Sequence, residues 1–371
     1  AVFVGIELEQ VARAESGGFN LTALTLGLAF GLLLLIAGWV AKNWEGEREY
    51  NDPLKTLPDF LATIGLGCAL VTCLTFTAND FPTTTALALA VFGLIALASR
   101  PLLRIGAVTV FGEINLLVGL FLWLPLGFTQ NSGLAPWSPL VMLGIFALAQ
   151  QWHQRLAEQK QDSPSSGFFL STICQAASVL GMGLIAVAGS LQLLNFDPTH
   201  MALAAVILGL IFSVQGYGLR SGQVFLLGQV FLIGAPVLFV FQLILPGPEF
   251  TWEWALVPLL AALGNGLALD RAQKHLAERV ETPTQSLGLF GGAAQMVSLV
   301  AGLIVALKFL PENDQLWALP VMGIALSTVC LGLRLTPALI AAQGFLFVPV
   351  MLVPMKLGDH PDALLTFIPI L

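Results

Sequence analysis

Residues 201–244 read MALAAVILGLIFSVQGYGLRSGQVFLLGQVFLIGAPVLFVFQLI, two long apolar runs that are interrupted only by the turn around Arg220. A helix needs roughly 20 apolar residues to cross a hydrocarbon core about 30 Å thick, and each run is of that order. The apolar residues are continuous, whereas the strands of a membrane barrel would alternate between apolar and polar residues. This stretch therefore predicts a hairpin of two membrane-spanning α-helices.

The composition of the whole chain indicates the same class of protein. Of the 371 residues, 57% are hydrophobic and 10% are charged, and the mean hydropathy is +0.86. A soluble domain carries about 25% charged residues, so this composition excludes a water-soluble fold. The net charge of −7 and the lack of a basic run exclude a nucleic-acid partner. We therefore predict an all-α fold, a polytopic transmembrane helix bundle.

Apolar runs bounded by charged residues, Pro or polar turns predict about 12 spans and a partial one. The predicted spans are 21–41, 59–78, 84–99, 105–127, 136–152, 167–194, 200–218, 222–245, 252–269, 287–310, 317–333 and 337–356. The last residues, 363–371, form a further apolar run that is too short to cross a bilayer. From this ending we expect either a piece of a longer protein or a short re-entrant or interfacial end.

The basic residues sort to one side of the predicted membrane. Of the 15 Lys and Arg residues, 12 fall in the loops after the odd-numbered spans. The loops on the other side are acidic, with Asp80, Asp197 and Asp314 among their residues. Because short basic loops stay in the cytoplasm, the pattern predicts an integral membrane protein with residues 1–20 outside.

An internal repeat of about 115 residues organises these spans. Three arginines recur at intervals of 116 and 114 residues, and nine residues after each comes a polar residue within an apolar run. The arginines are Arg104, Arg220 and Arg334, and the polar residues are Glu113, Gln229 and Gln343. A further predicted span carries Gln150 and, 115 residues later, another carries Asn265. The spacing predicts parallel four-helix units, because an even number of spans returns the chain to the same side.

The repeat divides the chain into four segments. Residues 1–58 form an outer segment, a first span and a cytoplasmic linker that ends an earlier unit, and they are followed by unit 1 (59–166), unit 2 (167–286) and a truncated unit 3 (287–371). The linkers 42–58, 153–166 and 271–286 are charged tails of the fourth helices. We expect these tails to be solvated, and the alternative is that they dock other membrane proteins.

Glu113 is the most informative of the polar positions, because a carboxylate in the middle of a span costs at least about 2.5 kcal/mol. Its counterparts Gln229 and Gln343 cannot exchange protons, so the role that all three share is hydrogen bonding between helices. The alternative is a proton or ligand site that Glu113 alone provides. Gln150 and Asn265 are further amides that could bond across helices.

The three arginines occupy tight turns on the predicted cytoplasmic side. Arg104, Arg220 and Arg334 are expected to anchor the helix ends at the lipid headgroups, and the alternative is specific binding of anionic lipids. The sequence contains no phosphate-binding loop, metal-ligand pair or nucleophile motif. We therefore predict no catalytic residue, no metal and no cofactor, and membrane lipids as the main partners.

The order of an apolar helix, an arginine turn and a second helix with an early polar residue and a later Pro resembles a known group. These are the large, repeat-built bacterial predicted membrane proteins that carry a domain of unknown function. The resemblance covers most of residues 57–371 and implies many tandem spans in the bacterial cytoplasmic membrane. The given residues do not include the cytoplasmic coiled-coil start that is often found there, as is expected of a fragment of such a protein. The group implies no catalytic residue.

Three classes of function remain. The first is a structural or assembly component of the cell envelope, which we favour because intramembrane charges and catalytic motifs are scarce. The second is a transporter or flippase with a path between repeat units. The third is a membrane enzyme that acts on a lipid-linked substrate, which the short outer loops disfavour.

Overall fold

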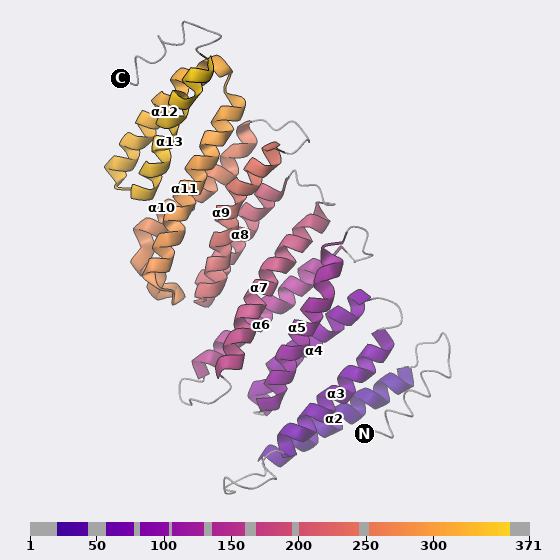
Figure 1. Cartoon of the computed structure of the whole chain (residues 1–371). Helices are drawn as coiled ribbons and strands as arrows, with labels where there is room; N and C mark the ends of the chain where they lie inside the picture. Colours follow the sequence, from indigo (N-terminus) through magenta and orange to yellow (C-terminus); the bar gives the residue numbers. More distant parts are fainter. Residues whose placement is uncertain are drawn as a thin grey trace. The chain divides into compact units, whose positions relative to one another are not determined.

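The computed structural model describes residues 21–43, 57–77, 82–103, 106–129, 136–159, 168–194, 200–244 and 252–356. In these ranges the regular structure is entirely helical, with twelve α-helices and no strand, which confirms the all-α prediction for this part of the chain (Figure 1). The helices are α2 (Leu21–Asn43), α3 (Leu57–Thr77), α4 (Pro82–Leu103), α5 (Gly106–Gly127), α6 (Ser138–Gln159), α7 (Phe168–Leu193), α8 (Met201–Leu219), α9 (Gly222–Ile244), α10 (Trp252–Val280), α11 (Thr284–Phe309), α12 (Glu312–Leu333) and α13 (Thr336–Lys356).

Eight helices in the described ranges are long and apolar enough to cross a membrane, namely α2, α5, α7, α8, α9, α10, α11 and α12. The apolar stretches of three others are shorter, at Leu57–Thr72, Thr84–Ser99 and Thr336–Met351. In α6 the sequence turns polar after Ala149, with QQWHQR at 150–155. Length and composition therefore indicate an integral membrane protein with several crossings.

Several predicted positions lie outside the described residues. They are Arg104, the outer-turn residues Asp80 and Asp197, residues 1–20, the apolar end 363–371, most of the linker 42–58 and the second half of the linker 153–166.

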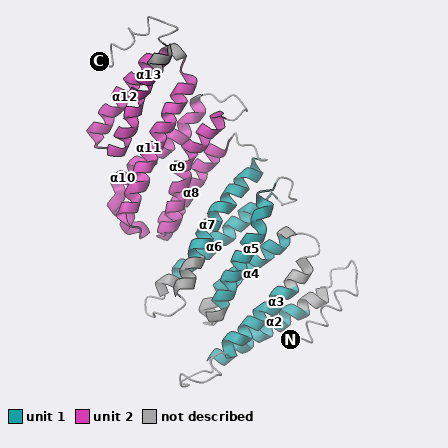
Figure 2. Cartoon of the chain, viewed as in Figure 1, with its two compact units in different colours: residues 1–195 teal, residues 196–371 magenta. Residues whose placement is uncertain are grey.

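The chain forms two compact units, residues 1–195 and residues 196–371 (Figure 2). We call them the N-terminal and the C-terminal unit. The division falls between α7 and α8, within the predicted second repeat. In each unit, helices that follow one another pack as hairpins: α2–α3, α4–α5 and α6–α7 in the first, and α8–α9, α10–α11 and α12–α13 in the second.

Glycines allow the helices of these hairpins to approach closely. In α4–α5, a methyl group added at Gly93 would lie 2.6 Å from the carbonyl oxygen of Gly112. In α8–α9, a methyl group at Gly209 would lie 3.0 Å from the carbonyl oxygen of Gly228. Small residues at the interface between membrane helices let the two backbones come together, and these contacts fix how the two helices of a hairpin are rotated against each other.

A leucine contact accompanies the glycines and recurs in α12–α13. The methyl group at Gly209 would also lie 2.6 Å from Leu232 Cγ, and one at Gly323 would lie 2.8 Å from Leu346 Cδ2. Both residues of the second contact lie 114 residues after those of the first. The α8–α9 and α12–α13 hairpins therefore share the register of their helix contact.

The turns of these two hairpins are also built alike. Arg220 and Arg334 adopt the left-handed conformation, with φ of 55° and 59°. The N–H of Arg220 donates to the carbonyl of Tyr217, and the N–H of Ser221 donates to that of Gly216. The same two bonds join Arg334 to Leu331 and Leu335 to Cys330. This is the Schellman arrangement, which satisfies the last carbonyls of the helix with backbone groups alone.

Candidate functional site

A chain of side-chain hydrogen bonds links three helices of the C-terminal unit. Gln229 on α9 is fully buried, and its Nε2 donates to the Oγ of Ser213 on α8 at 3.0 Å. Its Oε1 accepts from the Nδ2 of Asn265 on α10 at 2.6 Å. The Ser213 hydroxyl in turn donates to the carbonyl of Gly209 at 2.7 Å. The structure thus brings together two residues that the repeat spacing had selected separately, Gln229 and Asn265.

Two further polar side chains hold α11 against α10. Gln295 Nε2 donates to the carbonyl oxygen of Gly266 at 3.2 Å, and Ser298 Oγ donates to that of Leu259 at 2.7 Å. Both side chains are buried. The neighbouring backbones are close, because a methyl group at Gly266 would lie 2.8 Å from the carbonyl oxygen of Gly291. Polar residues in this unit are therefore used to join helices.

The corresponding place in the N-terminal unit holds ionisable groups. Glu113 on α5 and His153 on α6 are both buried, with 4% of each side chain exposed, and Glu113 Oε1 lies 3.8 Å from His153 Nδ1. The two groups form an ion pair only when the imidazole is protonated. A carboxyl group beside an imidazole can hold and transfer a proton, which the amides of Gln229 and Asn265 cannot do.

Gln150 and Thr109 add two more buried polar groups on the same two helices. Gln150 is fully buried, and among the described residues neither its Oε1 nor its Nε2 has a hydrogen-bond partner. Thr109 Oγ1, one helical turn before Glu113, is also buried and without a partner there. The bond that Gln229 makes with Asn265 therefore has no equivalent between Glu113 and Gln150, and Glu113 meets His153 instead.

Gln343, the third residue of the predicted set, is placed differently. Its side chain is exposed on α13. The Oγ of Ser327 on α12 stands 114 residues after that of Ser213, but it is buried and makes no hydrogen bond within the described part of the chain. We predicted one shared role for Glu113, Gln229 and Gln343, but the structure places their side chains in three different environments.

The candidate lipid anchors keep their side chains accessible. Arg220 and Arg334 are both exposed at the hairpin turns, and Arg104 lies outside the described residues. Exposed cations at helix ends are suited to lipid headgroups.

Sequence reasoning missed the roles of His153 and Ser213. His153 was grouped with a cytoplasmic tail, although it follows Gln150 by three residues and so shares its helix face. Ser213 gave no signal, because a single hydroxyl residue in an apolar helix is common.

The comparisons with known proteins give no relative: no family model matches the chain, and searches of curated proteins and of solved structures find no match either.

Proposed function

We propose that this protein is a multi-pass component of the bacterial cytoplasmic membrane with a structural or assembly role in the cell envelope, built from parallel four-helix repeats. The observation that carries the proposal is the hydrogen-bonded chain Ser213–Gln229–Asn265, which uses intramembrane polar groups to join α8, α9 and α10. Such bonds contribute around 0.6 kcal/mol each in membrane proteins. These side chains therefore act by fixing which helices contact each other, and this is a structural role and not a catalytic one.

The geometry of the hairpins supports the repeat. The Gly93–Gly112 contact of α4–α5 recurs 116 residues later as Gly209–Gly228 in α8–α9. The arginine turn and a glycine–leucine contact recur another 114 residues later in α12–α13. A recurring hairpin with a fixed register is the expected product of a duplicated unit.

The exposed apolar residues support lipids as the main partners. Large hydrophobic side chains are exposed along several helices, among them Phe121 (77%), Val214 (72%) and Leu289 (75%). Exposed apolar side chains of this kind are stable in a bilayer, and the accessible Arg220 and Arg334 fit the headgroup region. The twelve-span topology with residues 1–20 outside belongs to the same proposal.

A transporter is the second candidate, and the Glu113–His153 pair favours it. Ionisable residues inside membrane helices mark proton and ion pathways more often than packing contacts. The N-terminal unit combines Glu113 of the apolar α5 with His153 from the polar stretch of α6, and with the buried amide of Gln150, which makes no hydrogen bond within the described residues. The pair is confined to one place, whereas a conduction path requires polar groups across the whole bilayer.

Proton flux separates the two candidates. The full chain would be reconstituted in liposomes that contain a pH-sensitive dye, and a potassium gradient with valinomycin would drive protons. Under the structural role we expect no flux above that of empty liposomes, for the unchanged chain or for Glu113→Gln. Flux that Glu113→Gln and His153→Gln abolish, and that Gln295→Leu leaves intact, would replace the structural role by transport.

A further inference from the structure

One stripe of α13 is left uncovered. It consists of Ile340, Gln343, Phe347 and Val350, which share one side of the helix because they are three or four residues apart. All four are exposed, with 60% of Ile340, 65% of Phe347 and 46% of Val350 accessible. We call this set the α13 stripe.

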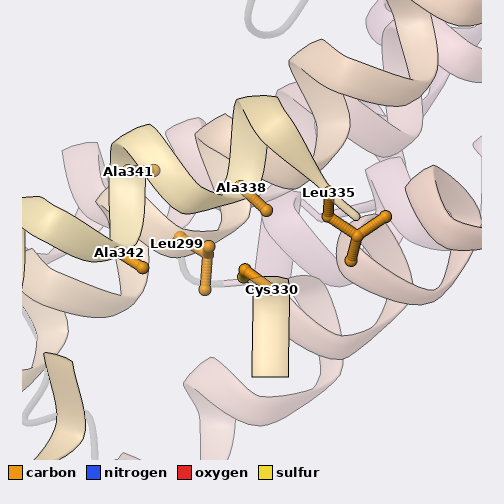
Figure 3. Packing of buried hydrophobic residues seen from close by; sticks show 6 residues of the cluster. All are labelled: Leu299, Cys330, Leu335, Ala338, Ala341 and Ala342. Carbon is orange, nitrogen blue, oxygen red and sulfur yellow. The ribbon is translucent and has the colours of Figure 1, made fainter. Parts of the chain in front are cut away.

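The opposite side of α13 is already occupied. Figure 3 shows Ala338, Ala341 and Ala342 of α13 packed with Leu299 of α11 and Cys330 of α12. These alanines are at most 7% exposed. The α13 stripe therefore has no remaining contact to make with α11 and α12.

The same stripe is covered in α9. Residues Leu226, Gln229, Ile233 and Pro236 stand 114 residues before those of the α13 stripe. Gln229 and Pro236 are buried, and Leu226 and Ile233 are half-buried. Helix α10 lies against α9, through the Asn265–Gln229 bond and through Leu269, which packs in one cluster with Leu226. Helix α10 is thus a partner that the α13 stripe lacks.

The polar groups of α12–α13 indicate what this partner carries. In α8–α9, Gln229 donates a hydrogen bond to Ser213 and accepts one from the amide of Asn265 on α10. Ser327 and Gln343 repeat the first two residues at the same spacing. The Ser327 hydroxyl is buried and makes no hydrogen bond within the described residues, and the Gln343 amide is exposed. A second amide that bonded Gln343 would hold its side chain between the helices, as Asn265 holds Gln229.

We propose that the α13 stripe docks a membrane-spanning partner helix that carries an Asn or Gln near the middle of its span. The inference rests on the repeat in the proposed function, since it treats α12–α13 as equivalent to α8–α9. An apolar helix with one central carboxamide covers the stripe and satisfies the exposed amide, which a bilayer cannot do.

Two segments of this sequence do not fit the description of the partner helix. Residues 357–371 contain no Asn or Gln. Gly31 of α2 packs against Gly65 of α3 in the same way as Gly266 of α10 packs against Gly291 of α11. The residue before Gly266 is Asn265, and the residue before Gly31 is Phe30, so α2 has a phenylalanine at the position of the asparagine. The α2 helix of a second copy would therefore place a phenyl ring opposite Gln343. A second copy that docked through α2 would therefore leave the Gln343 amide without a hydrogen bond.

The test uses α10 itself as the probe. A peptide of residues 252–280 with an acceptor dye at its start would be titrated into nanodiscs that hold the full chain. The donor dye would be attached through Met351→Cys in a background without other cysteines. The start of α10 packs near the end of α9, with Ala255 and Phe239 in one cluster, so docking brings the dyes together. We expect saturable energy transfer.

Matched variants make the result specific. The Asn265→Leu peptide and the Gln343→Leu protein should each bind about threefold more weakly, whereas Gln229→Leu in the protein should leave peptide binding unchanged. The inference is overturned by absent saturation, by equal affinity of both peptides, or by self-association of the protein that Gln343→Leu abolishes. The last outcome makes a second copy the occupant.

Thermal stability of the same samples distinguishes the two proposals. If Gln229→Leu lowers the melting temperature and the peptide fails to bind, the docking inference alone is wrong. If Gln229→Leu has no effect on the melting temperature, the proposal that the polar residues have a structural role is wrong, whatever the peptide does.

Discussion

The Nδ2 atom of Asn265 lies 2.6 Å from the Oε1 atom of Gln229, so a single hydrogen bond between side chains joins α10 to α9. The same Gln229 donates to Ser213 on α8. One fully buried amide thereby fixes three helices at one depth of the C-terminal unit. This arrangement makes the contribution of an individual pair measurable.

We expect Gln229 and Asn265 to be coupled energetically. In a double-mutant cycle with Gln229→Leu and Asn265→Leu, the interaction energy should be about 0.6 kcal/mol and below about 1.7 kcal/mol. Reversible unfolding in mixed SDS micelles would give the four free energies. Gln343→Leu, at an exposed side chain, is the control and should change stability less than Gln229→Leu. Strict additivity of the two substitutions would contradict the bond.

The glycine contact of α4–α5 predicts a size limit at Gly93. Gly93→Ala should destabilise the protein by about 1–3 kcal/mol, because the new methyl group meets the backbone oxygen of Gly112 at 2.6 Å. The control is Gly67→Ala in α3, where nothing lies within 4 Å of the added carbon. That change should stabilise by about 0.5–1 kcal/mol, since alanine favours the helix. Equal melting temperatures for both variants would disprove the close contact.

The left-handed turn residues predict an unusual benefit of glycine. Arg334 has a φ of 59°, so Arg334→Gly should raise the free energy of unfolding by about 1 kcal/mol. Arg334→Val should lower it, since a β-branched residue is disfavoured there. In contrast, Arg271→Gly within α10 should cost about 1 kcal/mol, because that position is helical. Chemical unfolding of the three variants checks the order.

Labelling from outside tests the proposed orientation. In a cysteine-free background, an impermeant maleimide added to intact cells should label Glu253→Cys and should not label Arg220→Cys. In permeabilised cells the maleimide should label both cysteine variants. Both side chains belong to exposed residues, so accessibility within the protein does not limit the reaction. Labelling of position 220 in intact cells would reverse the topology.

Glu113 predicts a contrast between two substitutions. Glu113→Gln should leave thermal stability nearly unchanged, because Gln keeps the shape and can still bond across helices, as Gln229 does. Glu113→Leu should cost about 1–2 kcal/mol, because it leaves buried polar groups on α6 without a partner. Melting curves in one detergent would show the difference. A large loss for Glu113→Gln would mean that the charge itself stabilises the pair with His153.

Much of this arrangement could be predicted from the chain alone. The apolar runs predicted the hairpins, because a span of fixed thickness sets the length of a helix. The repeat spacing also selected Gln229 and Asn265 as counterparts of Glu113 and Gln150, and the structure joins the first two. The repeat spacing locates a residue along its helix. This is sufficient to predict a contact when both residues lie at a similar depth in the membrane.

Spacing does not give the rotation of a helix about its axis. Gln343 has the same position in the sequence pattern as Gln229, yet it is exposed, since exposure depends on which neighbouring helix is present. The contact between Glu113 and His153 was missed for a related reason. Gln150 and His153 lie on one face of α6, and only the packing of α5 against it decides which of the two the carboxyl group approaches.

The backbone closure of the Arg220 and Arg334 turns has a consequence for how the protein is made. These turns need no side chain to hold them, so a hairpin can fold while it is still leaving the insertion machinery, before the helices that follow it have been synthesised. Glycine would fit the left-handed conformation more easily, but glycine has no charge. On the proposed topology, an arginine there also gives the hairpin its own orientation signal, so α8–α9 and α12–α13 could each enter the bilayer as a separate pair of helices.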